Sequence, residues 1–222
     1  MVSFARRQPS ALLLAAQLVG VLLYPAMEGN DVGRSLFSVF GIAILALVVL
    51  AVRATPAFPW FALLLGVPAT ILLLIQAVTR DDALLPYSSA LEAVLYLYAA
   101  YALIAYMFED HVITRDELYA VGATFTLVAW AFAYSFTVYQ AIEPHSFTAA
   151  VDPNGERSWM ELLFLSFTNL SSTGLSDVVP IKPFARSMVM IEQVAGVAYI
   201  AMVVSRLVGM LVISRQGVER RR

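Results

Sequence analysis

The stretch from Leu165 to Pro180 holds the residue types in this sequence that could do chemistry. It has an apolar start, followed by small hydroxyl residues, one glycine, an aspartate and a proline. Hydroxyl and carbonyl oxygens can replace the water shell of a cation, and glycine lets the backbone approach closely. Because long apolar runs flank the stretch, its irregular backbone would lie at membrane depth, which requires burial in protein or a water-filled path. We therefore predict a re-entrant loop, with a half-helix over Trp159 to Leu170 and an extended return.

The residues after this half-helix resemble the pore region of the tetrameric potassium-channel family. The filter of that family reads T-V-G-Y-G-D, and a proline follows after two further residues. The corresponding residues here are Ser172, Thr173, Gly174, Leu175, Ser176 and Asp177, followed by Pro180. Arg186 falls where many members carry a basic residue, and Gly196 falls where they carry the hinge glycine of the inner helix. The likeness covers Tyr119 to Met210, under half of the chain.

The resemblance implies an all-α membrane protein with six transmembrane helices, and a re-entrant pore helix and filter between the fifth and the sixth. It also implies a homotetramer in the lipid bilayer. Filter backbone carbonyls and the Ser172 hydroxyl would hold potassium or another monovalent cation as the permeant ion, and no other cofactor is implied. Gly196 is expected to be the bending point of the inner helix. The residues expected to line the cavity are Val197, Ile200 and Val204.

Four filter positions depart from the family pattern. Ser176 replaces the second glycine, which the family holds in a left-handed conformation, so a strain on the order of 1–2 kcal/mol is expected there. Leu175 replaces the tyrosine that braces the filter against the pore helix, as leucine does in members with two pore loops. Thr173 replaces a valine, and its hydroxyl needs a partner. Ser172 replaces the threonine of the innermost ion site and keeps an oxygen. The filter is expected to select potassium, to select weakly or not to conduct.

Composition bounds the class of protein. Of the 222 residues, 60% are hydrophobic and 14% are charged. A soluble domain carries about a quarter charged residues, so this is a membrane protein. There is no cysteine, hence no disulfide or thiolate site, and the net charge of −2 without a basic block argues against a nucleic-acid partner. No Gly-x-Ser-x-Gly, His-Glu-x-x-His or Walker pattern is present, so no catalytic residue is assigned and no enzyme is expected.

Six apolar runs could cross a bilayer, which takes about 17–25 residues. They are roughly Ala11 to Pro25, Leu36 to Val52, Pro59 to Val78, Ala90 to Phe108, Leu118 to Ala141 and Phe184 to Arg206. We divide the chain into a four-helix domain over residues 1–112, a pore domain over 113–214 and a short basic cytoplasmic tail over 215–222. Since Arg6 and Arg7 precede the first run, a signal peptide is an alternative, although the sequence before Pro25 makes a poor cleavage site.

The distribution of basic residues predicts the orientation. If the N-terminus is inside the cell, nine of the 14 Lys and Arg residues lie in the inner loops and five in the outer ones. Inner loops are enriched in basic residues, so both termini are expected in the cytoplasm of the cell. The loop Glu143 to Trp159 and the mouth of the filter then face outward.

The fourth run lacks the charges of a voltage sensor. Leu91 to Phe108 contains no arginine or lysine, and its one ionisable residue is Glu92. Voltage sensing needs several basic residues that cross the field, each worth about 2.3 kcal/mol per 100 mV. The first four helices therefore resemble an uncharged sensor-like bundle with a packing or assembly role, and steep voltage dependence is not expected.

Glu192 lies within the last apolar run, where an acid calls for an explanation. It could line or gate the pore, or its carboxyl could be satisfied by the hydroxyls of Ser166 or Thr168 on the pore helix. The register of the family assigns the cavity to other residues, so a structural role is favoured.

Three functions remain open. The first is a homotetrameric cation channel, most like a potassium channel, that is not voltage-gated. The second is a non-conducting membrane scaffold that descends from channels, which Leu175 and Ser176 support. The third is a subunit of a potassium-uptake transporter; such proteins carry four re-entrant loops in one chain, whereas one is found here.

Overall fold

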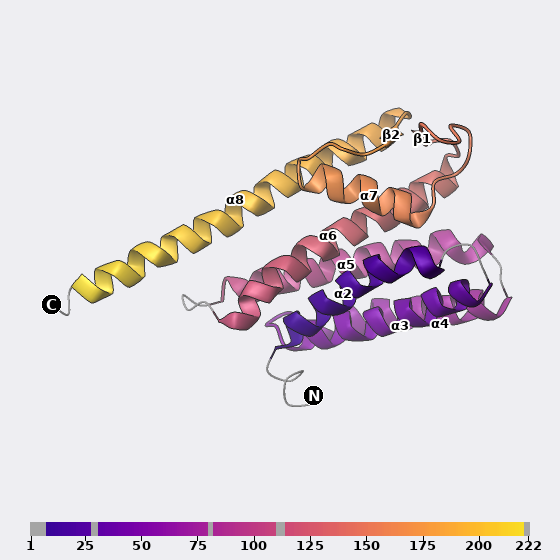
Figure 1. The fold of residues 1–222 in the computed structure, drawn as a ribbon. Helices are drawn as coiled ribbons and strands as arrows, with labels where there is room; N and C mark the ends of the chain where they lie inside the picture. Colours follow the sequence, from indigo (N-terminus) through magenta and orange to yellow (C-terminus); the bar gives the residue numbers. More distant parts are fainter. Residues whose placement is uncertain (1–7, 28–30, 80–81, 110–113, 220–222) are drawn as a thin grey trace.

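The computed structural model describes residues 8–27, 31–79, 82–109 and 114–219. The helices are α2 (Pro9–Met27), α3 (Asp31–Arg53), α4 (Pro59–Thr79), α5 (Leu85–Met107), α6 (Arg115–Ile142), α7 (Trp159–Leu170) and α8 (Pro183–Glu219). The short elements are the 3-10 turn η1 (Asp82–Leu84) and the strands β1 (Phe147–Ala149) and β2 (Val178–Pro180). Figure 1 shows α2 to α5 side by side, with α6, α7 and α8 forming a second part along them.

Helices α2 to α5 form a bundle that packs on α6. These helices are rich in leucine and alanine, which favour helix formation. α5 lies along α6, and small side chains at the contact are fully buried, among them Ala99, Ala102, Ala123 and Ala131. Short side chains let the two helix axes approach closely, which joins the bundle firmly to the second part of the chain.

Helix α6 begins at a capping box. The hydroxyl of Thr114 accepts a hydrogen bond from the backbone N–H of Glu117 at 3.2 Å, and the Glu117 carboxylate accepts one from the Thr114 N–H at 3.3 Å. The helix has 28 residues, so it is roughly 42 Å long at about 1.5 Å per residue and exceeds the hydrocarbon thickness of a bilayer.

Helix α7 lies between α6 and α8 (Figure 1) and has the bounds predicted for the half-helix. Ser158 starts it with a second capping box, in which the Ser158 N–H donates to the Glu161 carboxylate at 2.7 Å. Its 12 residues give a length of roughly 18 Å, which is too short to cross a bilayer. The chain then returns through irregular backbone to β2.

The two strands connect the loop after α6 to the start of α8. β1 pairs antiparallel with β2, with Phe147 opposite Pro180 and Ala149 opposite Val178. Both Phe147 and Val178 are buried, and they pack with Phe136 of α6 and Leu162 of α7 in a small apolar cluster. The loop after α6 thereby holds the far end of the irregular segment.

All six predicted apolar runs are helical in the described residues. Among the described residues, four helices are long and apolar enough to cross a membrane: α4, α5, α6 and the part of α8 from Pro183 to Gly209. The first two runs correspond to the shorter apolar helices Pro9–Pro25 and Val39–Arg53. α8 passes the predicted end at Arg206 and continues to Glu219, so the helix runs through the predicted boundary between residues 214 and 215.

Candidate functional site

The segment after α7 folds back on the last turn of that helix. The Thr168 carbonyl accepts hydrogen bonds from the backbone N–H groups of Thr173 at 2.9 Å and Gly174 at 3.1 Å. The Thr173 hydroxyl donates to the same carbonyl at 3.2 Å, so the predicted need for a partner is met. The position of the segment is therefore tied to the C-terminal end of α7.

The backbone strain lies at a different residue from the one predicted. Ser172 and Gly174 have positive φ angles, of 61° and 65°. Ser176 does not, so the expectation of a left-handed residue there was wrong. The cost of about 1–2 kcal/mol for a left-handed residue other than glycine falls on Ser172 instead. A Cβ added to Gly174 would meet nothing within 4 Å, so glycine is needed there for its conformation and not for space.

Most of the predicted filter residues are exposed within the single chain. Ser172, Thr173, Gly174 and Asp177 are exposed, and Leu175 is 78% exposed. Ser176 is partly buried, and its hydroxyl accepts a hydrogen bond from the Val178 N–H at 3.1 Å. The chain thus presents a short row of hydroxyl and backbone groups outside its own core. Oxygen atoms of this kind can coordinate a cation.

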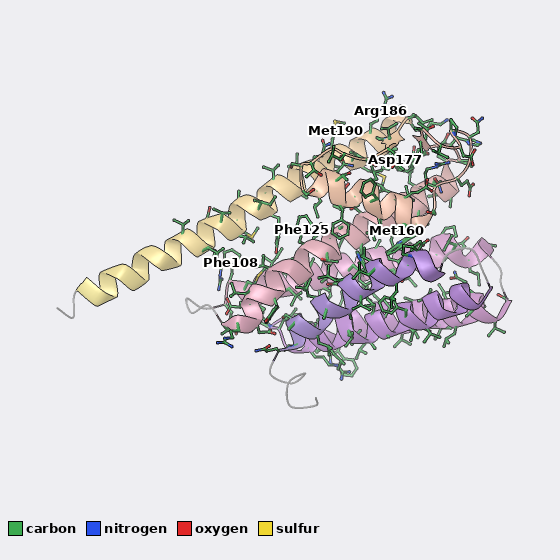
Figure 2. All side chains as sticks on the ribbon, in the orientation of Figure 1. Phe108, Phe125, Met160, Asp177, Arg186 and Met190 are labelled. Atoms are coloured by element: carbon green, nitrogen blue, oxygen red, sulfur yellow. The ribbon has the colours of Figure 1, made fainter. Side chains whose placement is uncertain are left out.

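The C-terminal end of the segment is held by backbone and side-chain contacts with the loop after α6 and with the start of α8. The Ile181 N–H donates to the Ser146 carbonyl at 2.9 Å, and the Lys182 ammonium lies 3.0 Å from the Glu143 carboxylate. Arg186, singled out in the sequence, donates from Nε to the Pro180 carbonyl at 3.2 Å. Figure 2 labels Asp177, Arg186 and Met190 where β2 meets the start of α8. Arg186 therefore fixes the proline that ends the segment.

Arg157 is a structural residue that the sequence reading missed. Its guanidinium donates to the carbonyls of Asp152 at 2.6 Å and Gly155 at 2.7 Å, and it pairs with Glu161 at 3.0 Å. Only 3% of its side chain is exposed. The turn signal in the sequence from Asp152 to Gly155 marked the loop, but only the fold turns the carbonyls of that loop toward one guanidinium. The loop is thereby locked to the start of α7.

One face of α8 packs on α6 and α7, and the other is free of contacts within the described chain. The packed face carries Ala185, Val189, Glu192, Gly196 and Tyr199, which are all buried. The residues expected to line a cavity are on the other face, with Val197 57%, Ile200 42% and Val204 52% exposed. The structure therefore brings these three residues together on one exposed apolar stripe, and does not bring them against the filter of the same chain.

Gly196 lies directly against the end of α7. A Cβ added at this position would overlap with the carbonyl oxygen of Leu170. α8 is helical without interruption through Gly196, the predicted hinge. The glycine has a packing reason that the sequence did not reveal, because a side chain there would displace the backbone that leads into the filter.

Glu192 is fully buried, and its Oε1 contacts the Ser166 hydroxyl of α7. The predicted structural partner is thereby confirmed as Ser166. The other candidate, Thr168, donates its hydroxyl to the Leu165 carbonyl within α7 at 2.9 Å. Next to this contact, the Gln193 amide donates to the Asn169 side-chain oxygen at 3.1 Å.

Two acids at the start of α6 bind side chains of α2 and α8. Arg206 of α8 pairs with Glu117 at 2.6 Å, and its guanidinium lies 5.0 Å from the ring centroid of Phe108. Asp116 accepts hydrogen bonds from the Ser10 hydroxyl at 2.8 Å and the Ser10 N–H at 3.1 Å. The sequence reading singled out neither acid. Together they tie α2 and α8 to the same turn of α6.

Glu92, the one ionisable residue of the fourth run, is buried in the bundle at 2% exposure. The Tyr134 side chain of α6 lies next to its carboxyl. Glu92 is thus buried against α6 and does not face the membrane.

A family model described as an ion channel matches residues 93–212, more than half of the 222-residue chain. The match begins in α5, includes α6, α7 and the segment after it, and ends in α8. Comparisons with curated proteins and with solved structures found no match. The long apolar helices are those of a membrane protein, as an ion channel requires. The matched region contains the exposed hydroxyl and glycine segment, Gly196 and the apolar stripe of α8, and on this ground the chain belongs to the ion channel family.

Proposed function

We propose that four copies of this chain assemble around a central axis and conduct a monovalent cation, with a preference for potassium. Ser172 to Asp177 would form the filter, with backbone carbonyls and the Ser172 hydroxyl as the ligands that replace the water shell of the ion. One such segment cannot enclose a path. Closed cyclic symmetry is the usual way for several copies to do so.

The geometry of α7 supports a re-entrant filter. The helix is too short to span, it lies between two helices that are long enough, and its last turn holds the filter through the Thr168 carbonyl. If α7 enters from the outer side, its C-terminal end points into the membrane. That end carries about half a negative charge, which favours a cation below the filter.

The exposed stripe of α8 supports the assembly. Val197, Ile200 and Val204 would line the cavity below the filter, and Gly196 would be the position at which α8 bends on opening. Because α8 packs on α7, which holds the filter segment, copies arranged around an axis would turn this apolar face toward a shared cavity. α5 has no basic residue that could move across the membrane field. The channel would therefore not be steeply voltage-gated.

One observation carries this proposal above the others: the segment of hydroxyl residues and glycine is exposed, yet its backbone is anchored at both ends. Thr168 holds it on one side, and the pairing of β1 with β2 holds it on the other. Anchoring at both ends holds the backbone oxygens at set positions, which a cation site made of carbonyls needs. By the distribution of basic residues, both termini would be cytoplasmic.

The test is ion flux in liposomes that contain the purified chain, with potassium compared to sodium. We expect potassium flux with reversal potentials that follow the potassium gradient more than the sodium gradient. The mass of the particle in mild detergent should correspond to four copies. A monomer or dimer would overturn the assembly, and equal background flux with and without protein would overturn conduction.

A non-conducting scaffold is the second candidate, and two observations favour it. Leu175 is exposed instead of bracing the filter, and the left-handed strain lies on Ser172, a residue other than glycine. A stable fourfold particle that carries no flux of any cation tested would select the scaffold over the channel.

A further inference from the structure

Glu192 is a buried acid that the proposed conduction path does not use. Its side chain is 0% exposed in the middle of a span, and its Oε2 has no hydrogen-bond partner among the described residues. Its Oε1 contacts the Ser166 hydroxyl, which lies in α7 four residues before the last residue of that helix.

The contacts of the Ser166 hydroxyl indicate whether the Glu192 carboxyl carries a proton. The Ser166 oxygen also lies 2.8 Å from the Ala129 carbonyl oxygen of α6. A carbonyl oxygen only accepts, and a hydroxyl has one proton. If the Ser166 hydroxyl donates its proton to the Ala129 carbonyl, it can only accept at its contact with Glu192. The Glu192 carboxyl must then carry a proton and donate it to the Ser166 oxygen. Both contacts are satisfied at once only when Glu192 is a neutral carboxylic acid that donates to the Ser166 oxygen.

The surroundings agree with a neutral acid. Besides Glu192, the charged residues on α6, on α7 and on α8 up to Gly209 are Arg115, Asp116, Glu117, Glu161, Arg186 and Arg206. At about 1.5 Å per residue, Arg186 and Arg206 lie roughly 9 Å and 21 Å along α8 from Glu192, and Glu161 lies roughly 8 Å along α7 from Ser166. Glu161 is paired with Arg157, and Arg206 is paired with Glu117. An ionised carboxylate without a partner is strongly disfavoured at such a depth.

We propose that Glu192 is a positioning residue for the filter, in its protonated form, and this rests on the proposed function. Through Ser166 it joins α8 to α7 and, by way of the Ala129 carbonyl, to α6. The contacts of Gln193 with Asn169 and of Gly196 with Leu170 continue the same interface toward the filter. Glu192 therefore holds the helix whose Thr168 carbonyl fixes Thr173 and Gly174.

The protonation of Glu192 is tested by infrared spectroscopy of the full-length protein at neutral pH. We expect the carbonyl band of a protonated carboxylic acid to be lost in Glu192→Gln. The band should shift but persist in Ser166→Ala, because the acid loses its acceptor. Glu92 is a second buried glutamate, so Glu92→Gln is the matched control. The band assigned to Glu192 should remain in the spectrum of this variant. A spectrum that is unchanged by Glu192→Gln would overturn the assignment.

The positioning role is tested by hydrogen exchange of the Thr173 and Gly174 amides. In Glu192→Ala we expect exchange to be faster by about tenfold, the effect of losing one hydrogen bond to a buried group. Glu192→Gln keeps a neutral donor and should exchange at the wild-type rate. Equal rates in the alanine variant and the wild type would overturn the role.

Reversal potentials complete the test. Glu192→Ala should lower the preference for potassium over sodium, and Glu192→Gln should keep it. A protein that carries no current would refute the proposed function, while the infrared band and the exchange rates would still decide the state and the role of Glu192.

Discussion

The bundle of α2 to α5 and the region of α7 and α8 bury their polar groups in different ways. In α7, the side chains of Ser166, Thr168 and Asn169 are buried, and each makes a hydrogen bond. In the bundle, both amide atoms of Gln17 and the hydroxyl of Ser89 are buried without a partner among the described residues. The bonds of Ser166 to the Ala129 carbonyl and of Asn169 to the Gln193 amide join α7 to its neighbours α6 and α8, whereas the buried amide of Gln17 in the bundle is surrounded by apolar packing alone.

This difference indicates which part of the chain needs accurately placed backbone atoms. Apolar packing is not directional, and it tolerates changes that conserve volume. A hydrogen bond fixes a distance and an angle. A segment that binds a cation through its backbone needs the second kind of support, since the ligand atoms must lie at set distances. The following predictions test the contrast, from the largest expected effect to the smallest.

Arg157→Ala should destabilise the fold most. The change removes hydrogen bonds to buried loop carbonyls and the pair with Glu161, so we expect a loss of about 3 kcal/mol in the free energy of unfolding. Thermal unfolding in detergent measures it. Arg186→Ala is the matched control, because Arg186 is exposed and makes one hydrogen bond; its loss should stay below about 1 kcal/mol. Equal losses would mean that Arg157 does not hold the loop from Asp152 to Gly155 in place.

Gly196→Ala should cost about 1–3 kcal/mol, the usual range for overpacking. The added Cβ meets the Leu170 backbone, which must move together with the filter, so we expect ion preference to change as well as opening. Gly209→Ala is the control on the same helix, because a Cβ there meets nothing within 4 Å. If Gly196→Ala alters opening alone, Gly196 acts as a hinge and its contact with Leu170 is without consequence.

Leu175→Tyr should raise the preference for potassium over sodium by about tenfold, which corresponds to about 1.4 kcal/mol, or one well-placed hydrogen bond. Tyrosine restores the brace that the resemblance predicts at this position. Ser176→Gly should add little to the double variant, because Ser176 is not left-handed and its hydroxyl holds the Val178 N–H. Reversal potentials under potassium and sodium gradients measure both. A wild-type channel with the selectivity of full-motif relatives would contradict this prediction.

Gln17→Leu should leave the bundle unharmed or stabilise it by about 1 kcal/mol, since it removes a buried amide without a partner. Ser166→Ala, in the other region, should destabilise by a similar amount because it removes the hydroxyl that contacts the buried Glu192 carboxyl and the Ala129 carbonyl. The two variants are compared by their unfolding midpoints in detergent. Effects of the same sign would remove the distinction between the two regions.

The smallest effect is expected from membrane voltage. α5 contains no arginine or lysine, and a charge that does not move across the field contributes nothing to gating. The conductance should vary little between negative and positive potentials. A steep conductance–voltage curve would contradict this prediction, because it would require basic residues that cross the field.

Local sequence determined the helices and the place of the candidate filter. Ser158 with Glu161 forms a capping box at the start of α7, and the hydroxyl and glycine residues end the helix at Leu170. These signals involve neighbours within a few residues, so they can be read without a fold. The apolar runs predicted the long helices for the same reason. The partner of Glu192 followed from the residue types available on the pore helix.

Tertiary structure alone decided the backbone of the filter and its supports. The left-handed residue lies at Ser172 because the chain must turn back to the Thr168 carbonyl, and the family pattern had indicated Ser176. Gly196 meets Leu170, and Arg157 gathers the loop carbonyls, only once α7 lies between α6 and α8. Such contacts join residues that are distant in the chain or depend on the direction of single peptide groups, and no local pattern of residue types records either.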